Sequence, residues 1–215
     1  ARALALAWGK PLLPVNHLAA HAYSLQLAHP FEYPHIILLV SGGHTLLLHA
    51  RGPLELDILG STLDDACGEA FDKVAKHLGL EYPGGPAIDR LASGGDANLI
   101  PYPSAKLEGE GHRFDFSFSG RKTSVLYHTP RLAGDKRPTP ADIAASFQKC
   151  AVNTLLEKAR LACRELGIPR AGAVGGVSAN SYLRRATSEN DGLRWALPPP
   201  SLCTDNAAMV AGLGC

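Results

Sequence analysis

The segment VNHLAAH, residues 15–21, places His17 and His21 four residues apart. On an α-helix this spacing puts both side chains on one face, so the two imidazoles could bind one metal ion. In HExxH zinc proteases a glutamate follows the first histidine as general base, but here that position is Leu18. Many histidines only satisfy local hydrogen bonds, so the pair taken alone fits a structural role better. A third ligand elsewhere in the chain would reverse that preference.

Two glycine pairs follow predicted strands, Gly42-Gly43 and Gly175-Gly176. Glycine lets backbone amides approach a phosphate or a sugar without a Cβ atom in the way. The second pair also precedes a predicted helix, whose first amides favour anions. Each pair alone is equally typical of a turn. Together they indicate a nucleotide cleft, because α/β sheets bind ligands beyond their strand ends.

Three carboxylates each allow two interpretations. Asp72 and Asp89 are either solvated charges or acceptors for ribose hydroxyls. Asp205 precedes the last predicted helix, where it is either an N-cap or the missing third metal ligand. The residues Arg121 and Lys122 follow a predicted strand and could form a basic edge near a nucleic acid; a structural strand with solvated charges is the simpler interpretation.

Hydrophobic periodicity predicts three strands and a helix, followed by alternating strands and helices. This order indicates an α/β protein with a mixed sheet covered by helices. The predicted strands are 12–15, 35–40, 45–50, 54–59, 114–119, 171–174 and 193–196. The predicted helices are 1–8, 17–28, 61–78, 140–166, one after residue 180 and one from residue 205, with loops at 81–85 and 93–111.

Composition limits the class of protein. A chain of 215 residues can form one large domain or two small lobes. The net charge of +1 excludes a supercharged nucleic-acid binder but not a local basic patch. The 5 cysteines are scattered without a CxxC motif, which favours thiols in a reducing compartment. No apolar run approaches the ~20 residues that span a bilayer. Both ends of the sequence suggest a fragment.

Six segments occur in one order along the chain: NHLAAH, LLVSGGHT, DDACGEAFDKVAKHLGLEYPGGP, DFSFSGRKT, GGVSAN and CTDNAAM. Together they resemble the TsaD family of tRNA threonylcarbamoyladenosine synthases, formerly labelled sialoglycoprotein endopeptidases. The bacterial and mitochondrial branch is the more similar one. One departure is Ala19-Ala20, where many relatives carry Glu or Gly, so the surroundings of the metal could differ.

The resemblance implies an actin/Hsp70-like ATPase fold (ASKHA, ribonuclease-H-like) with an incomplete first lobe. Residues 1–34 would be the end of that lobe with its metal-binding helix, and residues 35–215 most of the second lobe. It also implies that His17, His21 and Asp205 bind one divalent metal ion, Fe²⁺ or Zn²⁺. The implied substrate contacts are Leu39, Val40, Ser41, Gly42, Gly43, Asp72, Gly85, Asp89 and Asn180.

The implied reaction transfers a threonylcarbamoyl group from threonylcarbamoyl-AMP to N6 of the adenosine next to the anticodon of tRNAs that read codons beginning with A. The implied partners are this tRNA and, in bacteria, TsaB-like and TsaE-like proteins. The implied location is the bacterial cytoplasm or, alternatively, the mitochondrion. Since about a third of the family's usual length is absent at the N-terminal end, we expect this chain alone to bind nucleotide poorly.

Other functions fit parts of the pattern. An ATPase or sugar kinase of the same fold would share the glycine loops but would not need the histidine pair with Asp205. A metal-dependent glycoprotease would need a base near the metal, against which Leu18 argues. A truncated chain could also serve only as a binding module. The sequence assigns neither a general base nor a nucleophile.

Overall fold

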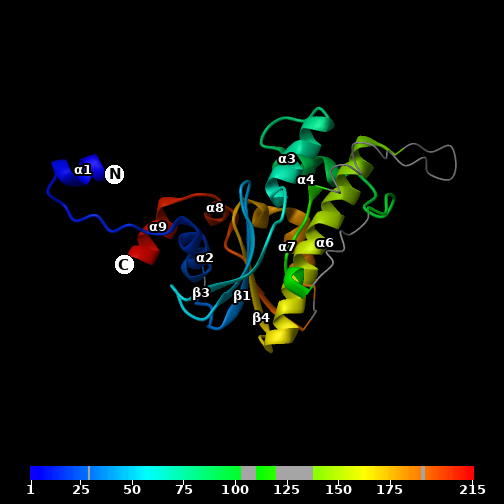
Figure 1. Cartoon of the computed structure of the whole chain (residues 1–215). Helices are drawn as coiled ribbons and strands as arrows, with labels where there is room; N and C mark the ends of the chain where they lie inside the picture. The colour runs from blue at the N-terminus through cyan, green and yellow to red at the C-terminus, as the bar shows by residue number, and fades with distance from the viewer. Residues whose placement is uncertain (29, 103–109, 120–137, 190–191) are drawn as a thin grey trace.

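The computed structural model describes residues 1–28, 30–102, 110–119, 138–189 and 192–215 (Figure 1). A sheet lies between helices on both faces, and helix α1 stands away from this body on an extended segment. The strands are β1 (His35–Val40), β2 (Thr45–Ala50), β3 (Leu56–Ser61), β4 (Arg170–Val174) and β5 (Arg194–Ala196). The helices are α1 (Arg2–Ala7), α2 (His17–Ala28), α3 (Cys67–His77), α4 (Gly84–Ala92), α6 (Pro140–Leu166), α7 (Ser181–Ser188), α8 (Pro200–Cys203) and α9 (Ala207–Gly214), with short 3₁₀ turns η1 (Glu110–His112) and η2 (Gly176–Ala179).

The five strands lie in the order β3-β2-β1-β4-β5. β2 is antiparallel to both β1 and β3, whereas β4 is parallel to both β1 and β5. The antiparallel strands follow one another closely, while each parallel pair needs a long crossover that contains a helix. The predicted mixed sheet is therefore confirmed. Because β1 and β4 run in the same direction, the loops after Val40 and Val174 lie at the same edge.

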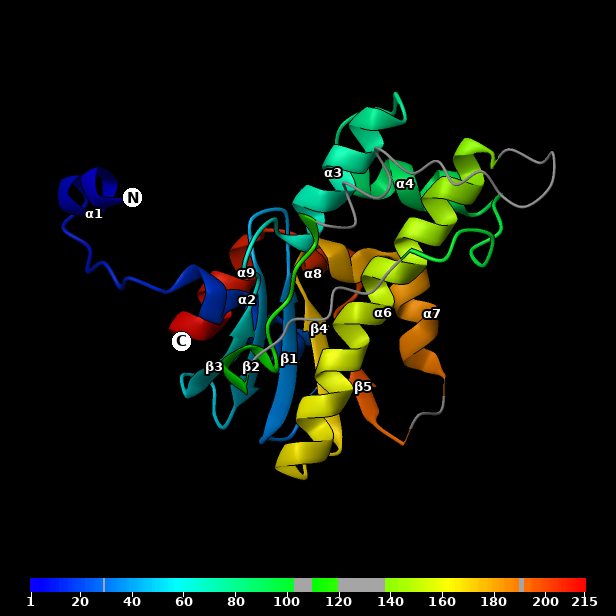
Figure 2. The same ribbon diagram turned by 45° about the vertical axis from the view of Figure 1, so that its right-hand side comes forward.

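The central strand β1 is buried on both faces, as all six of its residues are inaccessible. Ile36 and Leu38 pack with α3, α4 and α6, while Ile37 and Leu39 pack with α2 on the opposite face. Figure 2 shows the two layers, with α6 and α7 on one side of the sheet and α2 and α9 on the other. Helices on both faces explain why residues 36–40 of β1 are continuously apolar instead of alternating.

Helix α6 begins and ends where its sequence predicts. Thr139 forms a capping box with Asp142, and Pro140 occupies the first turn. The helix ends at Gly167, whose φ of 66° is the left-handed conformation that glycine adopts without a steric penalty. Helix α6 packs on β1 and β4 and supplies much of the larger core.

Several predicted boundaries are wrong near the start of the chain and around β3. Residues 11–16 form no strand, because Pro11 and Pro14 cannot donate to a ladder. Strand β3 begins two residues later than predicted. Helix α3 begins at Cys67 and not at residue 61, because the backbone amide of Cys67 donates to the Thr45 hydroxyl at 2.8 Å and the preceding residues form a turn.

Helix α4 was not predicted at all. Its first residues, Gly84 and Gly85, lie in a segment predicted to be a loop because paired glycines are poor helix formers. Burial of Ala87, Ile88 and Ala92 against the core stabilises the helix despite its glycine start. Tertiary packing therefore outweighs local propensity here.

The segment 114–119 was predicted to be a strand, but it contributes only one bridge, between Thr62 and Phe116. The carboxylate of Asp64 accepts hydrogen bonds from the Phe118 and Ser119 amides, which a neighbouring strand would otherwise bind. The predicted common face is confirmed, because all three phenylalanines of this segment pack on the larger core. Arg121 and Lys122, the predicted basic edge, lie outside the described residues.

Two further expectations concern the whole chain. None of the five cysteines, all of which lie in described segments, takes part in a disulfide bond. Among the described helices, none combines the length and the apolar character needed to cross a membrane.

Candidate metal centre and adjoining cavity

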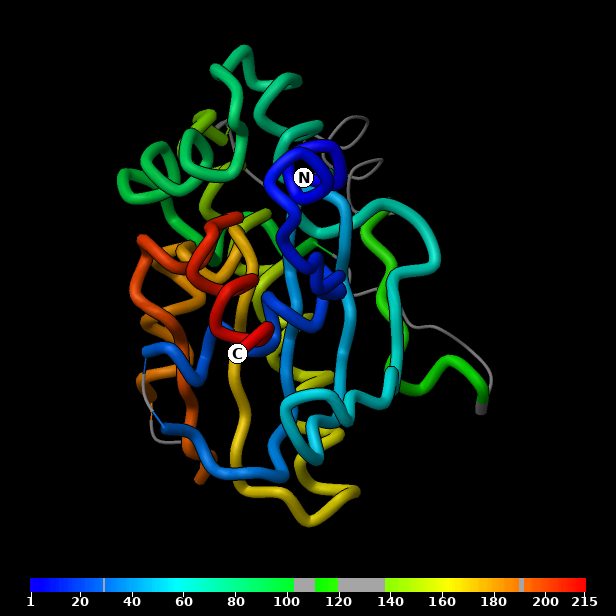
Figure 3. Tube along the Cα trace, turned by 90° about the vertical axis from the view of Figure 1, so that its left-hand side faces the viewer, coloured from blue at the N-terminus to red at the C-terminus, as the bar shows by residue number. Residues whose placement is uncertain are grey.

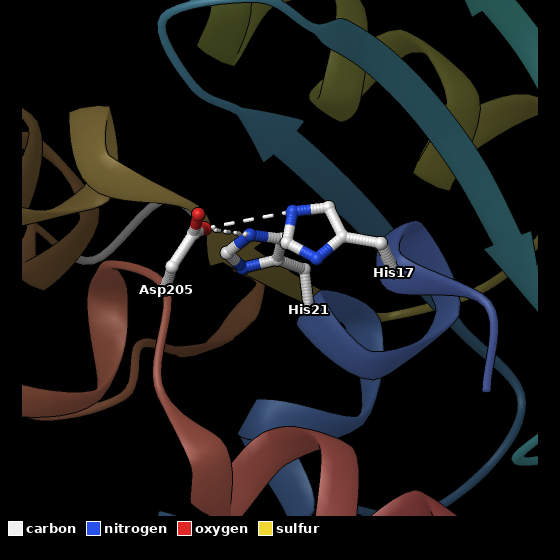
Figure 4. Close-up of side chains that lie close together, drawn as sticks. All are labelled: His17, His21 and Asp205. Atoms are coloured by element: carbon white, nitrogen blue, oxygen red, sulfur yellow. Dashed lines mark hydrogen bonds and ion pairs between the residues drawn. The ribbon is translucent and has the colours of Figure 1, made fainter. Parts of the chain in front are cut away.

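His17, His21 and Asp205 converge although Asp205 is distant in sequence from the histidines. One turn of α2 separates the two imidazoles, and the turn between α8 and α9 brings the carboxylate to them (Figure 4). Asp205 Oδ1 lies 2.9 Å from His21 Nε2 and 3.5 Å from His17 Nε2. One possible ligand atom from each residue falls within 4.8 Å of the others. The helix spacing and the turn thus place two nitrogens and one oxygen around a common point.

The two interpretations of Asp205 are resolved by its neighbour. Asn206 is the N-cap of α9, because its side-chain oxygen accepts a hydrogen bond of 2.9 Å from the amide of Met209. The Asn206 side chain also donates to the carbonyl of Thr204 at 2.9 Å, which fixes the turn. Asp205 is therefore not a helix cap, and its largely exposed carboxylate points at the histidines.

The two histidines differ in environment. His21 is buried, with 2% of its surface exposed, whereas about half of the His17 side chain is exposed. Burial lowers the pKa of His21 below its usual value; His17 and His44 add to this effect and Asp205 opposes it. His21 is thus held as the neutral imidazole that a metal ion requires.

The donor set fits a divalent cation. When His21 Nε2 binds a metal ion, the ring proton lies on Nδ1, which is buried and has no hydrogen-bond partner among the described residues. Two imidazoles and one carboxylate match the ligand types of zinc and non-haem iron sites, and three protein ligands leave coordination positions open.

A cavity of about 380 Å³ adjoins these residues. One part of its wall is apolar and is built by α3, the following turn, α4 and η2. Another part carries carboxylates, an amide and glycines. The lining residues are Gly42, Gly68, Phe71, Asp72, Tyr82, Pro83, Gly85, Pro86, Asp89, Gly176, Val177, Ala179, Asn180 and Thr204. Its size and mixed lining suit a nucleoside-sized ligand.

Glycines at this edge of the sheet are required by close backbone contacts. A Cβ atom on Gly175, whose φ is 89°, would lie 2.4 Å from the carbonyl oxygen of Val40. A Cβ atom on Gly68 would lie 2.6 Å from the carbonyl oxygen of Ser41. In contrast, a Cβ atom on Gly42 would meet nothing within 4 Å, so the space beside its backbone is open.

The carboxylates of Asp72 and Asp89 hold the walls of the cavity together. Asp72 Oδ1 accepts a 2.7 Å hydrogen bond from the first amide of α4, at Gly84. Asp89 accepts from both the amide and the hydroxyl of Ser181, at 3.0 and 2.7 Å, and from Asn180 Nδ2 at 3.3 Å. Each carboxylate thus joins two elements and still borders the cavity.

The predicted contact residues do not all reach this cavity. Gly42, Asp72, Gly85, Asp89 and Asn180 line it. Ser41 and Gly43 flank Gly42 in the turn after β1 but are outside the lining set. The side chains of Leu39 and Val40 are fully buried in the core, so only their backbone could face a ligand.

Sequence reasoning missed the apolar wall and Thr204. Phe71 is a buried residue of α3 that also borders the cavity, and an apolar residue of a helix gives no signal of such a position by its type. Tyr82 and Pro83 lie in the turn-rich segment 81–85, where proline and glycine masked the wall that they form. The one available signal for Thr204 was its position in the sequence beside Asp205, a predicted metal ligand.

A family model described as TsaD, tRNA N6-adenosine threonylcarbamoyltransferase, matches residues 1–212. A protein of that name from Anaeromyxobacter dehalogenans strain 2CP-1 is 51% identical over 219 residues, covering 100% of this chain and 65% of the relative. Another from Symbiobacterium thermophilum is 48% identical over 218 residues, covering 100% of this chain and 63% of the relative. The chain thus spans a little under two thirds of the length of these relatives.

Solved structures share the fold at low sequence identity. Full-length HypF in a phosphate- and nucleotide-bound form matches with a TM-score of 0.74 and 17% identity, over 95% of this chain and 42% of that chain. The activator of the 2-hydroxyisocaproyl-CoA dehydratase from Clostridium difficile with bound ADPNP matches with a TM-score of 0.56 and 17% identity, over 93% of this chain and 65% of that chain. The predicted ASKHA-like fold is therefore confirmed.

Proposed function

The chain belongs to the TsaD family, and from this membership we propose that its natural gene product transfers a threonylcarbamoyl group to N6 of an adenosine in tRNA. The observation that supports this function best is the convergence of His17, His21 and Asp205 beside the nucleoside-sized cavity. The proposed donor is threonylcarbamoyl-AMP, and the proposed acceptor lies next to the anticodon of tRNAs that read codons beginning with A.

The proposed roles of the residues follow from their positions. The apolar wall holds the adenine, and Asp72 and Asp89 accept hydrogen bonds from the ribose hydroxyls. Amides of the glycine turns after β1 and β4 face the phosphate. We retain Leu39 and Val40 as backbone contacts, and Ser41, Gly43, Gly85 and Asn180 as further contacts. This arrangement fixes the donor, so that little orientational freedom is lost in the reaction.

His17, His21 and Asp205 would hold one divalent metal ion, Fe²⁺ or Zn²⁺. When bound, such an ion supplies Lewis acidity that polarises a carbonyl or phosphoryl oxygen. In the reaction the N6 nitrogen forms a bond to the carbamoyl carbon. The bond between that carbon and the phosphate oxygen breaks, AMP leaves with the electron pair, and the amine proton passes to solvent.

The alternatives make different predictions. A kinase or ATPase of this fold would hydrolyse ATP or transfer its phosphate, and this reaction would not require His17, His21 and Asp205. A glycoprotease needs a base, but the candidate metal group in the described part of the chain contains no glutamate and Leu18 follows His17. We therefore keep the acyl transfer as the proposed function, with tRNA as macromolecular partner, TsaB-like and TsaE-like proteins as helpers and, by analogy with the bacterial relatives, the cytoplasm as location.

The test is reconstitution with the gene product as it occurs in the cell. Protein, unmodified tRNA and enzymatically generated threonylcarbamoyl-AMP are combined, and threonylcarbamoyladenosine is measured by nucleoside mass spectrometry. We expect product with the wild-type protein and its loss with His21→Ala. ATP hydrolysis without tRNA modification would instead support the kinase or ATPase.

A calorimetric titration addresses the 215-residue chain by itself. We propose that this chain alone binds adenylates weakly, because it corresponds to only 65% and 63% of the length of these two relatives. The division into a lobe remnant at 1–34 and a second lobe at 35–215 stays a prediction. Tight adenylate binding by this chain alone would contradict the proposal that it binds adenylates weakly.

A further inference from the structure

Thr204 is the residue at which the cavity and the candidate metal centre meet. It lines the cavity, and the next residue in the chain is the ligand Asp205. Consecutive Cα atoms are ~3.8 Å apart, so Thr204 lies within one residue length of the metal group. Thr204 is thus the cavity-lining residue that adjoins a member of the candidate metal group in sequence.

The Thr204 side chain has a defined orientation. Its methyl carbon Cγ2 faces Gly176, lying 3.9 Å from where a Cβ atom on that glycine would be. Its backbone is extended, with φ −89° and ψ 174°, and its carbonyl oxygen accepts from Asn206 Nδ2. The turn thus holds the backbone of Thr204 in place, and its methyl group lies on the side of Gly176.

The Thr204 hydroxyl has no structural task in the described part of the protein. It makes no hydrogen bond there, whereas the nearby hydroxyls of Ser178 and Ser181 donate to Gly175 O and Asp89 Oδ1 at 2.7 Å. Thr204 ends α8 as its C-cap residue through its backbone, and its hydroxyl does not cap α9, whose N-cap is Asn206. An exposed hydroxyl with a fixed backbone and no protein acceptor is suited to donate to a ligand.

We propose that Thr204 is a further catalytic residue, whose hydroxyl donates a hydrogen bond to an oxygen of the acyl-phosphate linkage; this rests on the proposed function. As the N6 nitrogen bonds to the carbamoyl carbon and the carbon–oxygen bond to AMP breaks, negative charge grows on the linkage oxygens. A fixed donor at that place stabilises the transition state more than the bound donor substrate. The hydroxyl keeps its own proton throughout.

The test compares Thr204→Val, which keeps the shape and removes the hydroxyl, with Thr204→Ser, which keeps the hydroxyl. Ser201→Ala is the matched control, because Ser201 is exposed on α8, three positions earlier, and outside the cavity lining. For each variant of the natural gene product, kcat and KM for threonylcarbamoyl-AMP are measured with saturating tRNA, and the metal content is measured by mass spectrometry.

We expect Thr204→Val to lower kcat ~100-fold, as the loss of one oxyanion donor does. Thr204→Ser and Ser201→Ala should keep most of the activity, and all variants should keep the wild-type metal content. A Val variant with at least half of the wild-type kcat would overturn the proposal. So would equal losses in Val and Ser, or a loss of metal in the Val variant.

Folding and the underlying function are controlled separately. Circular dichroism checks each variant, and Thr204→Ala replaces the Val variant if that one does not fold. A wild-type protein that binds metal but forms no threonylcarbamoyladenosine would refute the proposed function, and the assignment of Thr204 would fall with it. An active wild type with a fully active Val variant would refute Thr204 alone.

Discussion

His17 and His21 share a helix face but not an environment. His21 is almost completely buried, and its lowered pKa keeps it neutral near pH 7. His17 and Asp205 are exposed, at 53% and 79% of their side-chain surface. In the proposed metal site, the buried imidazole would therefore be a fixed anchor, and the two exposed side chains could adjust to an ion.

Replacing Asp205 should abolish tight metal binding. Asp205→Asn keeps the shape but removes the negative charge, and we expect the affinity for Zn²⁺ or Fe²⁺ to fall by more than the ~10–100-fold that loss of an outer-shell partner causes. Metal content after dialysis, measured by plasma mass spectrometry, checks this. Asp57→Asn, which alters an exposed carboxylate on β3 that pairs with Arg51, is the control. Equal metal content in both variants would contradict the site.

His35, far from the metal group, should make stability depend on pH. Burial lowers its pKa below 6.5, Arg170 and His49 act in the same direction, and a hydrogen bond with the Glu32 carbonyl opposes them. The unfolded chain therefore takes up a proton near pH 6.5 that the folded protein takes up only at lower pH. The free energy of unfolding should therefore be unaffected by His35 above about pH 7 and should fall as the pH drops below about 6.5.

His35→Phe should reduce this dependence, since a phenyl ring can keep the contacts with the Phe31 and Tyr33 rings. Urea denaturation at pH 7.5 and pH 5.5 measures the change in unfolding free energy. The buried His21 adds to the same slope, so some dependence should persist. His77→Gln, at an exposed position, should leave the slope as in the wild type. If the unfolding free energy of His35→Phe changed with pH as much as that of the wild type, His35 would not be a source of the pH dependence.

At the scale of elements, α3 and α4 approach so closely that only glycine fits between them. A Cβ atom on Gly84 would lie 2.6 Å from both Ala75 Cβ and Asp72 Cα. On Gly85, the next residue, it would meet nothing within 4 Å. Adjacent glycines thus serve different purposes, one for packing and one at the cavity.

This difference gives a matched pair of variants. Gly84→Ala should destabilise the protein by about 1–3 kcal/mol, because the two helices must move apart. Gly85→Ala should be neutral or slightly stabilising, because alanine favours helix more than glycine does. Urea denaturation of both variants under the same conditions measures the difference. Equal stability of the two variants would show that the close packing at Gly84 is absent.

An element can be predicted from the sequence when local interactions fix it, but not when contacts with distant residues do. Thr139, Pro140 and Gly167 mark both ends of α6, because caps act locally. The strand predicted at 114–119 could not be corrected from sequence, because Asp64, which binds its amides, is distant along the chain. Likewise the spacing of His17 and His21 predicts a shared face, but the approach of Asp205 depends on the whole fold, and only family resemblance identified it.

At the scale of the whole molecule, α1 stands outside the body (Figure 1, and nearest the viewer in Figure 3). None of its residues is buried, and Leu6 and Trp8 are 85% and 67% exposed. Exposed apolar side chains in such a row contribute little to the stability of this chain.

Deleting residues 1–9 should therefore leave the unfolding free energy unchanged within ~0.5 kcal/mol, the range of a neutral surface change. Met209→Ala in α9, at the other end of the chain, should cost about 2–5 kcal/mol because Met209 is buried. Urea denaturation of the 215-residue chain compares the two. A large loss on deletion would show that α1 packs on the body in solution.

The pairing of β1 with β4 has a consequence for synthesis on the ribosome. β1 and β2 are neighbours in sequence and can pair as soon as both have emerged, but the other edge of β1 must wait until β4 has been translated. Until then the most apolar strand of the nascent protein has an unpaired edge, which invites aggregation. Chaperone binding during translation should accordingly be strongest before β4 leaves the exit tunnel and should decline once it has docked.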